Sequence, residues 1–134
     1  MKNHNLIMIS QDTDLFLAAM GLNVIGDALA RHIKYADILR SKSGCRSKIL
    51  VITYVPRKYY KFHKKKFVQD GLIIIPSFSY LRLFFFLDVM RILLNELSNG
   101  FQPNLITTQN PWGEGLIALI ISKIIKCNFL PQLH

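Results

Sequence analysis

Short apolar runs alternate with longer helical patterns along the chain, and this alternation restricts the fold more than any other feature. The runs are rich in Ile, Leu, Val and Thr and span residues 6–10, 48–55, 72–75, 105–108 and 129–133. Apolar residues at three- and four-residue steps, which give a helix one buried face, occur in the stretches 24–40, 81–97 and 112–126. Strands that alternate with helices form βαβ units. The sequence therefore predicts an α/β fold: a Rossmann-like open parallel sheet of about five strands with helices on both faces.

The sequence also indicates where connectors lie and where two of the strands end. Residues 11–23 show neither pattern and are expected to form a connector. Pro56 is expected to end the second strand and Pro76 the third, because proline has no N–H to donate to a sheet.

The composition indicates one domain with an anionic partner. A chain of 134 residues has room for a single core, and an apolar content of 51% is enough to fill it. Lys and Arg number 17 against 8 Asp and Glu, which gives a net charge of +9. The charge alone leaves the partner open between nucleic acid, a phosphorylated substrate and an anionic membrane surface.

Neither a secretory signal nor a membrane span is evident in the sequence. The first residues run into a short strand-like segment instead of a signal-peptide core, and the most apolar stretch, 81–94, is interrupted by charges. These charges are Arg82, Asp88 and Arg91. Cys45 and Cys127 lie far apart, and Cys127 is expected to be a buried thiol, which fits a reducing cytosol better than secretion.

The turn after residues 105–108 is unusually rich in chemistry. It carries Gln109, Asn110, Trp112 and Glu114. In one interpretation the turn is a helix cap, with Asn110 at the N-cap position and Glu114 near the positive end of the helix dipole. In the other it is a ligand site, because turns that follow parallel strands lie at the edge where α/β folds bind ligands. The two interpretations are compatible, and the residues alone leave both open.

Common catalytic and cofactor motifs are absent from the sequence. No Gly-x-Gly-x-x-Gly follows the first run and no Gly-Lys-Ser/Thr occurs, so dinucleotide and P-loop sites are unsupported. The histidines have no zinc-ligand spacing, and no metal site is expected. His32 lies on the apolar face of the helix 24–40 and is predicted to pack in the core.

The basic segment 57–66 interleaves cations with aromatic residues. Such a mixture can bind nucleic acid, can lie on an anionic membrane, or can be a solvated loop. The neighbouring Phe84, Phe85 and Phe86 favour the membrane, because Phe and Leu beside cations suit the headgroup boundary. The predicted membrane-binding residues are Arg57, Lys58, Lys61, Lys64, Lys65 and Lys66.

Four stretches resemble a known enzyme family. TTQNPWGEGLIA (107–118), followed one helix later by FLPQLH (129–134), resembles the amino-terminal domain of a family 4 (group 1) glycosyltransferase of GT-B fold. GDALARH (26–32) resembles the first helix of some of these enzymes, and VITY (51–54) resembles their second strand. The Gly-Gly turn common in the family is replaced by the separated Gly21 and Gly26.

The resemblance implies a retaining, metal-independent enzyme with two facing domains and no cofactor. This chain would be the acceptor-side domain, and the carboxyl-terminal nucleotide-sugar domain is expected to be absent from it. The implied catalytic residue is His134, close to the transferred sugar and the donor phosphate. The implied cleft residues are Gly26, Asp27, Arg31, Gln109, Asn110, Trp112 and Glu114.

The leading hypothesis is therefore transfer of a sugar to a cell-envelope, lipid-linked or polysaccharide acceptor. It places the chain in the cytoplasm, peripherally on the inner face of the cytoplasmic membrane, and expects it to be inactive without the donor domain. A second hypothesis is a membrane-recruiting subunit that docks a separately encoded donor domain. A nucleic-acid-binding domain and a gene remnant rank below both, and no nucleic-acid partner is expected.

Overall fold

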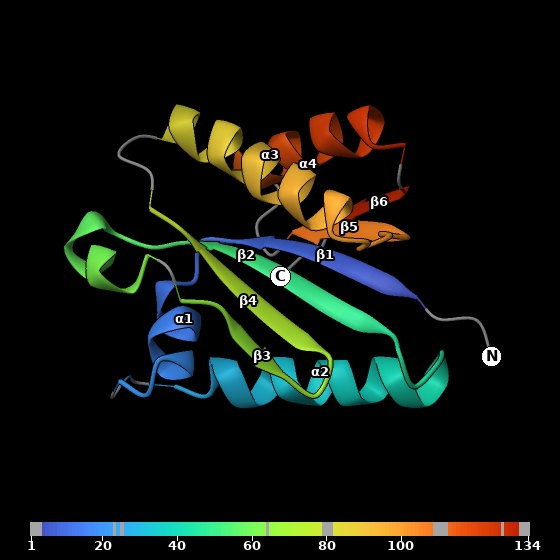
Figure 1. Cartoon of the computed structure of the whole chain (residues 1–134), viewed down its shortest axis with the longest axis horizontal. Helices are drawn as coiled ribbons and strands as arrows, with labels where there is room; N and C mark the ends of the chain where they lie inside the picture. The colour runs from blue at the N-terminus through green and yellow to red at the C-terminus, as the bar shows by residue number, and fades with distance from the viewer. Residues whose placement is uncertain are drawn as a thin grey trace.

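A six-stranded sheet forms the centre of the computed structural model, which describes residues 4–22, 24, 26–63, 65–78, 82–108, 113–126 and 128–131 (Figure 1). The strands are β1 (Asn5–Ser10), β2 (Lys48–Tyr54), β3 (Phe67–Gln69), β4 (Leu72–Ser77), β5 (Leu105–Thr108) and β6 (Asn128–Pro131). Their order is β3-β4-β2-β1-β5-β6, with β3 antiparallel to β4 and every other pairing parallel. The predicted Rossmann-like α/β class is confirmed, with one short edge strand beyond the expected five.

Helices cover both faces of the sheet. α1 (Thr13–Ala19) and α2 (Ala28–Lys42) lie on one face, and α3 (Arg82–Ser98) and α4 (Gly113–Ile124) lie on the other (Figure 1). Side chains that alternate along β1 divide between two cores: Ile7 and Ile9 pack with α3 and α4, whereas Met8 packs with α1 and α2. Because both faces of the central strands β1, β2 and β4 are buried, these strands consist mostly of apolar residues.

The expected connector over residues 11–23 is wrong, because α1 lies within it. The helix has only seven residues, too few for a helical period to show in the sequence. Leu15, Phe16 and Leu17 are all buried, so tertiary packing stabilises this helix although its sequence shows no helical period. α2 begins at Ala28, later than the predicted residue 24, since Gly26 has a φ of 104° that a helix does not accept.

Within the basic segment 57–66, residues Arg57–Phe62 form a 3-10 helix, η1. Tyr59 and Phe62 are half-buried and pack against the core beneath α1 and α2. Two apolar anchors three residues apart suit the 3-10 period, in which positions i and i+3 share one side. The basic segment is therefore fixed to the domain at Tyr59 and Phe62.

The predicted stop at Pro76 is wrong, since β4 continues through Pro76 to Ser77. On its outer edge β4 pairs with β3 only from Leu72 to Ile74. Beyond Ile74 that edge has no strand neighbour among the described residues, and proline is tolerated where no N–H is required. The open end of this edge is where a groove forms.

None of the helices in the described part of the chain is long and apolar enough to cross a membrane.

Candidate functional site

The strand order creates a topological switch point between β1 and β5. After β1 the chain builds α1, α2, β2, β3 and β4 on one side of β1, and after α3 it returns on the other side as β5. The helices that follow β1 and β5 lie on opposite faces of the sheet (Figure 1). Open α/β sheets bind ligands in the crevice that such a reversal leaves at the carboxyl ends of the strands.

Hydroxyl groups fix the turn between β1 and α1 at this edge. Thr53 Oγ1 donates a hydrogen bond to the Asp12 carbonyl at 3.0 Å, and Thr13 Oγ1 donates to the Tyr54 carbonyl at 3.1 Å. The Asp12 N–H donates to Ser10 Oγ at 2.9 Å. The two threonine bonds tie the turn to the end of β2 and so fix its position at this end of the sheet.

The predicted cleft residues at the start of α2 lie at the same end of the sheet, because α2 runs antiparallel to the strands. Asp27 occupies the N-cap position without making a side-chain cap bond, and Asp27 Oδ1 lies 3.1 Å from Arg31 Nε. Both side chains are more than half exposed. This pair can contact a ligand, although the structure supplies no fixed second partner for either charge among the hydrogen bonds and ion pairs of the described residues.

His32 packs in the core as predicted, with only 2% of its surface exposed. Its Nδ1–H donates to the Ala28 carbonyl at 2.7 Å, and its ring meets Tyr35 edge-on. Burial lowers the pKa of His32 below 6.5, opposed by the bond to Ala28 and by the charge of Asp12.

Several predicted residues cannot be placed. Lys64, Gln109, Asn110, Trp112, Cys127 and His134 lie outside the described residues. Glu114 lies in the first turn of α4, consistent with the expected helix start, but only its backbone is described. The catalytic assignment of His134 therefore stays a prediction. No group of three His, Cys, Asp or Glu side chains among the described residues could hold a metal ion.

The predicted membrane-binding cations separate into two sets. Lys58 and Lys61 are exposed and lie over the rings of Tyr59 and Phe62, on the outer side of η1. The other described cations of the segment, Arg57, Lys65 and Lys66, line a groove between η1 and α3.

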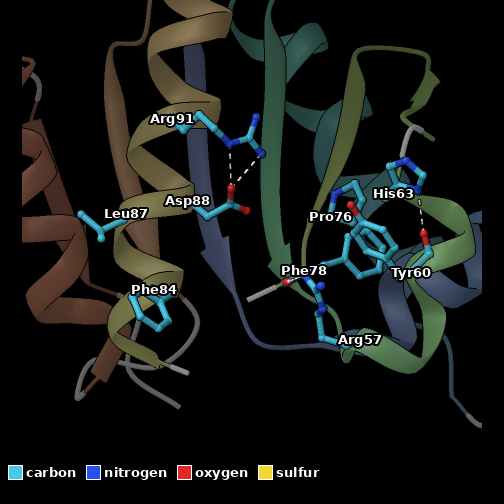
Figure 2. Close-up of a pocket in the computed structure, with 9 residues that line it drawn as sticks. All are labelled: Arg57, Tyr60, His63, Pro76, Phe78, Phe84, Leu87, Asp88 and Arg91. Atoms are coloured by element: carbon cyan, nitrogen blue, oxygen red, sulfur yellow. Dashed lines mark hydrogen bonds and ion pairs between the residues drawn. The ribbon is translucent and has the colours of Figure 1, made fainter. Parts of the chain in front are cut away.

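We call this depression the η1–α3 groove. Its main pocket has a volume of about 560 Å³ and is lined by Arg57, Tyr60, His63, Pro76, Phe78, Phe84, Leu87, Asp88 and Arg91 (Figure 2). A smaller pocket of about 220 Å³ shares His63, Pro76 and Arg91 with it and continues along α3 to Glu96 and Asn99. The groove begins at Pro76, where β4 has lost its neighbour β3.

The two walls of the groove are built differently. On the α3 wall, Phe84, Asp88 and Arg91 recur at steps of four and three residues and so share one side of the helix. On the η1 wall, the ring of His63 stacks on the ring of Tyr60 with 4.3 Å between their centroids. Arg57 Cζ lies 4.7 Å from the centroid of the Tyr60 ring. Arg57 Nη1 also donates to the Phe78 carbonyl at 3.1 Å. Both walls thus present positioned cations beside apolar surface.

The sequence interpretation missed this groove. In the sequence, Asp88 and Arg91 argue against a membrane span. Their helical spacing within an otherwise apolar helix also indicates a polar stripe, which is the signal that could have located the α3 wall. The η1 wall had no comparable signal, because its position opposite α3 depends on how the sheet ends.

Comparison with known protein families and with curated proteins gives no match to this chain.

Proposed function

We propose that this chain is the acceptor-side domain of a glycosyltransferase of GT-B type. The observation that carries the proposal is the placement of β5 beside β1: Thr108, the last residue of β5 and directly before the turn expected over 109–114, lies at the switch point of the sheet. That turn holds the residues with the most specific resemblance to the family. The start of α2, with Gly26, Asp27 and Arg31, lies at the same end of the sheet.

In this proposal the cleft forms between this domain and a nucleotide-sugar domain. The turn 109–114 and the Asp27–Arg31 pair contact the acceptor, and His134 lies close to the transferred sugar and the donor phosphate. Groups of the donor domain stabilise the leaving diphosphate, because charge that develops in the transition state needs positioned donors or cations. The chain alone is therefore inactive.

We also propose that the domain works on the inner face of the cytoplasmic membrane. Lys58 and Lys61 are exposed on η1, and α3 and α4 expose apolar residues. These are Leu94, Leu116, Leu119, Ile120 and Ile124, together with Phe84 and Leu87, which also line the η1–α3 groove. Exposed cations and exposed apolar side chains on one domain suit an anionic headgroup boundary.

A transfer assay tests the proposal. The chain is combined with the nucleotide-sugar domain that its own reading frame or a neighbouring gene encodes, and incorporation of labelled sugar into lipid and polysaccharide fractions is measured. We expect incorporation by the combination and none by either part alone. His134→Ala is expected to reduce the rate at least a hundredfold, whereas His4→Ala, far along the chain, leaves it unchanged.

Turnover of a nucleotide-sugar by the isolated 134 residues would contradict the division into two domains. Absence of a nucleotide-sugar domain from both the frame and its neighbours would overturn the proposal itself. A donor domain encoded only as a separate chain would instead favour the docking-subunit hypothesis.

A further inference from the structure

We propose that the η1–α3 groove binds a sugar that carries an anionic group, either a phosphate or a carboxylate. Arg91 holds the anion, Arg57 adds positive charge on the opposite wall, and the apolar part of the walls packs against the sugar ring. The inference that this sugar is the acceptor rests on the proposed function, whereas the binding itself rests on the groove alone.

The charge of the lining favours an anion. The two pockets of the groove contain four arginine or lysine residues and two carboxylates, which leaves a net charge of +2. Each carboxylate is already matched to a cation: Asp88 to Arg91, and Glu96 to Lys66 at 3.0 Å. An entering anion therefore meets a positive field in a concave, partly desolvated site.

Arg91 is held in place before any ligand arrives. Its Nε and Nη2 lie 2.8 and 2.7 Å from Asp88 Oδ1, while Asp88 Oδ2 accepts a hydrogen bond from the buried Ser77 hydroxyl at 2.6 Å. Figure 2 shows this pair projecting from α3 toward the centre of the groove. The Arg91 side chain remains 69% exposed, and its Nη1 takes no part in the ion pair with Asp88. A guanidinium fixed in this way loses little freedom when it binds phosphate or carboxylate.

The apolar part of the lining suits a ring. Tyr60 is fixed between the stacked His63 and the edge of Phe78, whose ring centroid lies 5.5 Å away. Phe84 is 48% exposed on the opposite wall. His63 Nδ1–H donates to the Tyr60 carbonyl at 2.8 Å, so in the neutral ring Nε2 is the acceptor, the group that a sugar hydroxyl needs. Aromatic faces with a few placed polar groups are typical of small-molecule sites.

The size of the groove also selects the ligand class. A pocket of about 560 Å³ falls within the usual range for small molecules and accommodates a sugar with one anionic substituent. Nucleic acid fits less well, because a phosphate backbone needs cations along an extended track, whereas the two adjoining pockets of the groove carry a net charge of only +2.

Binding to the isolated chain tests this proposal. Glucose 6-phosphate, glucuronate, glucose and inorganic phosphate are titrated separately, and affinity is measured by calorimetry and by NMR shifts of the groove residues. We expect glucose 6-phosphate or glucuronate to bind at least tenfold more tightly than glucose or phosphate. The ratio of the affinities for glucose 6-phosphate and glucuronate identifies the preferred anionic group. Arg91→Gln is expected to lower the affinity for the tighter-binding ligand at least tenfold, and Arg91→Lys to lower it less. A lysine keeps the positive charge but loses the paired N–H donors of the guanidinium.

Lys34→Gln on α2 is the matched control, since it removes the same charge from an exposed position away from the groove. Equal binding of all four probes would overturn the proposal, as would an equal loss in Arg91→Gln and Lys34→Gln. Tighter binding of a single-stranded oligonucleotide in the same groove would replace it with the nucleic-acid alternative. Because no sugar is transferred in these titrations, their outcome is independent of the glycosyltransferase assay.

Discussion

Burial of a single imidazole makes the stability of the domain depend on pH. The pKa of His32 is lowered by burial below its unfolded value of about 6.5. Below pH 6.5 the unfolded chain binds a proton that the folded His32 does not, so stability falls as the pH decreases until the folded pKa is reached. We expect urea unfolding to show a larger loss of stability between pH 7.5 and 5.5 for the wild type than for His32→Gln.

The control for this comparison is Lys34→Gln, which changes an exposed residue of the same helix without removing an imidazole and should keep the pH dependence of the wild type. An identical pH dependence in the wild type and His32→Gln would contradict the assignment. If His32→Gln does not fold, an NMR titration of the His32 ring in the wild type gives the same answer, since its midpoint must lie below 6.5.

The packing role of His32 was predictable from its helical position, whereas its hydrogen bond was not. The spacing of apolar residues in 24–40 places His32 on the buried side. The bond from Nδ1 to the Ala28 carbonyl depends on the ring orientation, which tertiary packing decides. Sequence thus predicts which side chains are buried better than it predicts how their polar atoms are satisfied.

At the scale of elements, one ion pair ties the segment before β3 to α3. Glu96 is 7% exposed and its carboxylate lies 3.0 Å from Lys66 Nζ. Lys66→Gln leaves that carboxylate buried without its cation, which should lower the free energy of unfolding by about 1–3 kcal/mol. Urea denaturation measures the change.

Lys65→Gln serves as the matched control for Lys66→Gln, because Lys65 is an exposed neighbour without a carboxylate partner among the described salt bridges, and its effect should stay within about 0.5 kcal/mol. The double variant Lys66→Gln/Glu96→Gln should recover part of the loss. Equal effects of Lys66→Gln and Lys65→Gln on the free energy of unfolding would show that the Lys66–Glu96 ion pair does not stabilise the fold.

Elements that show an apolar or helical pattern in the sequence were predictable, and α1 and β3, which show none, were not. β5 has the predicted bounds, because an apolar β-branched run shows in four residues. α1 and β3 are too short for a period, although Asp70-Gly71, both with positive φ, was a recognisable hairpin signal before β4. Pro76 was misjudged because its tolerance depends on how far β3 extends, a property of the sheet and not of the residue.

At the scale of the whole molecule, the alternation of elements predicted the layers but not the order of the strands. The placement of β1 beside β5, and with it the switch point, follows only from the assembled sheet. The groove between η1 and α3 depends likewise on the missing neighbour of β4. A candidate site can therefore be predicted from local turns, whereas a site built across elements requires the fold.

The exposed cations on the outer side of η1 give the last prediction, which concerns how the molecule meets a membrane. We expect the wild type to sediment with vesicles that contain anionic lipid and the Lys58→Gln/Lys61→Gln variant to bind about thirtyfold more weakly, because each cation near an anionic surface contributes about 1 kcal/mol. Lys34→Gln/Lys48→Gln removes the same charge from α2 and from the start of β2 and should bind like the wild type. An equal loss in both variants would show that net charge alone causes the attraction, and absence of wild-type binding would remove the membrane from the proposed function while leaving the transfer reaction intact.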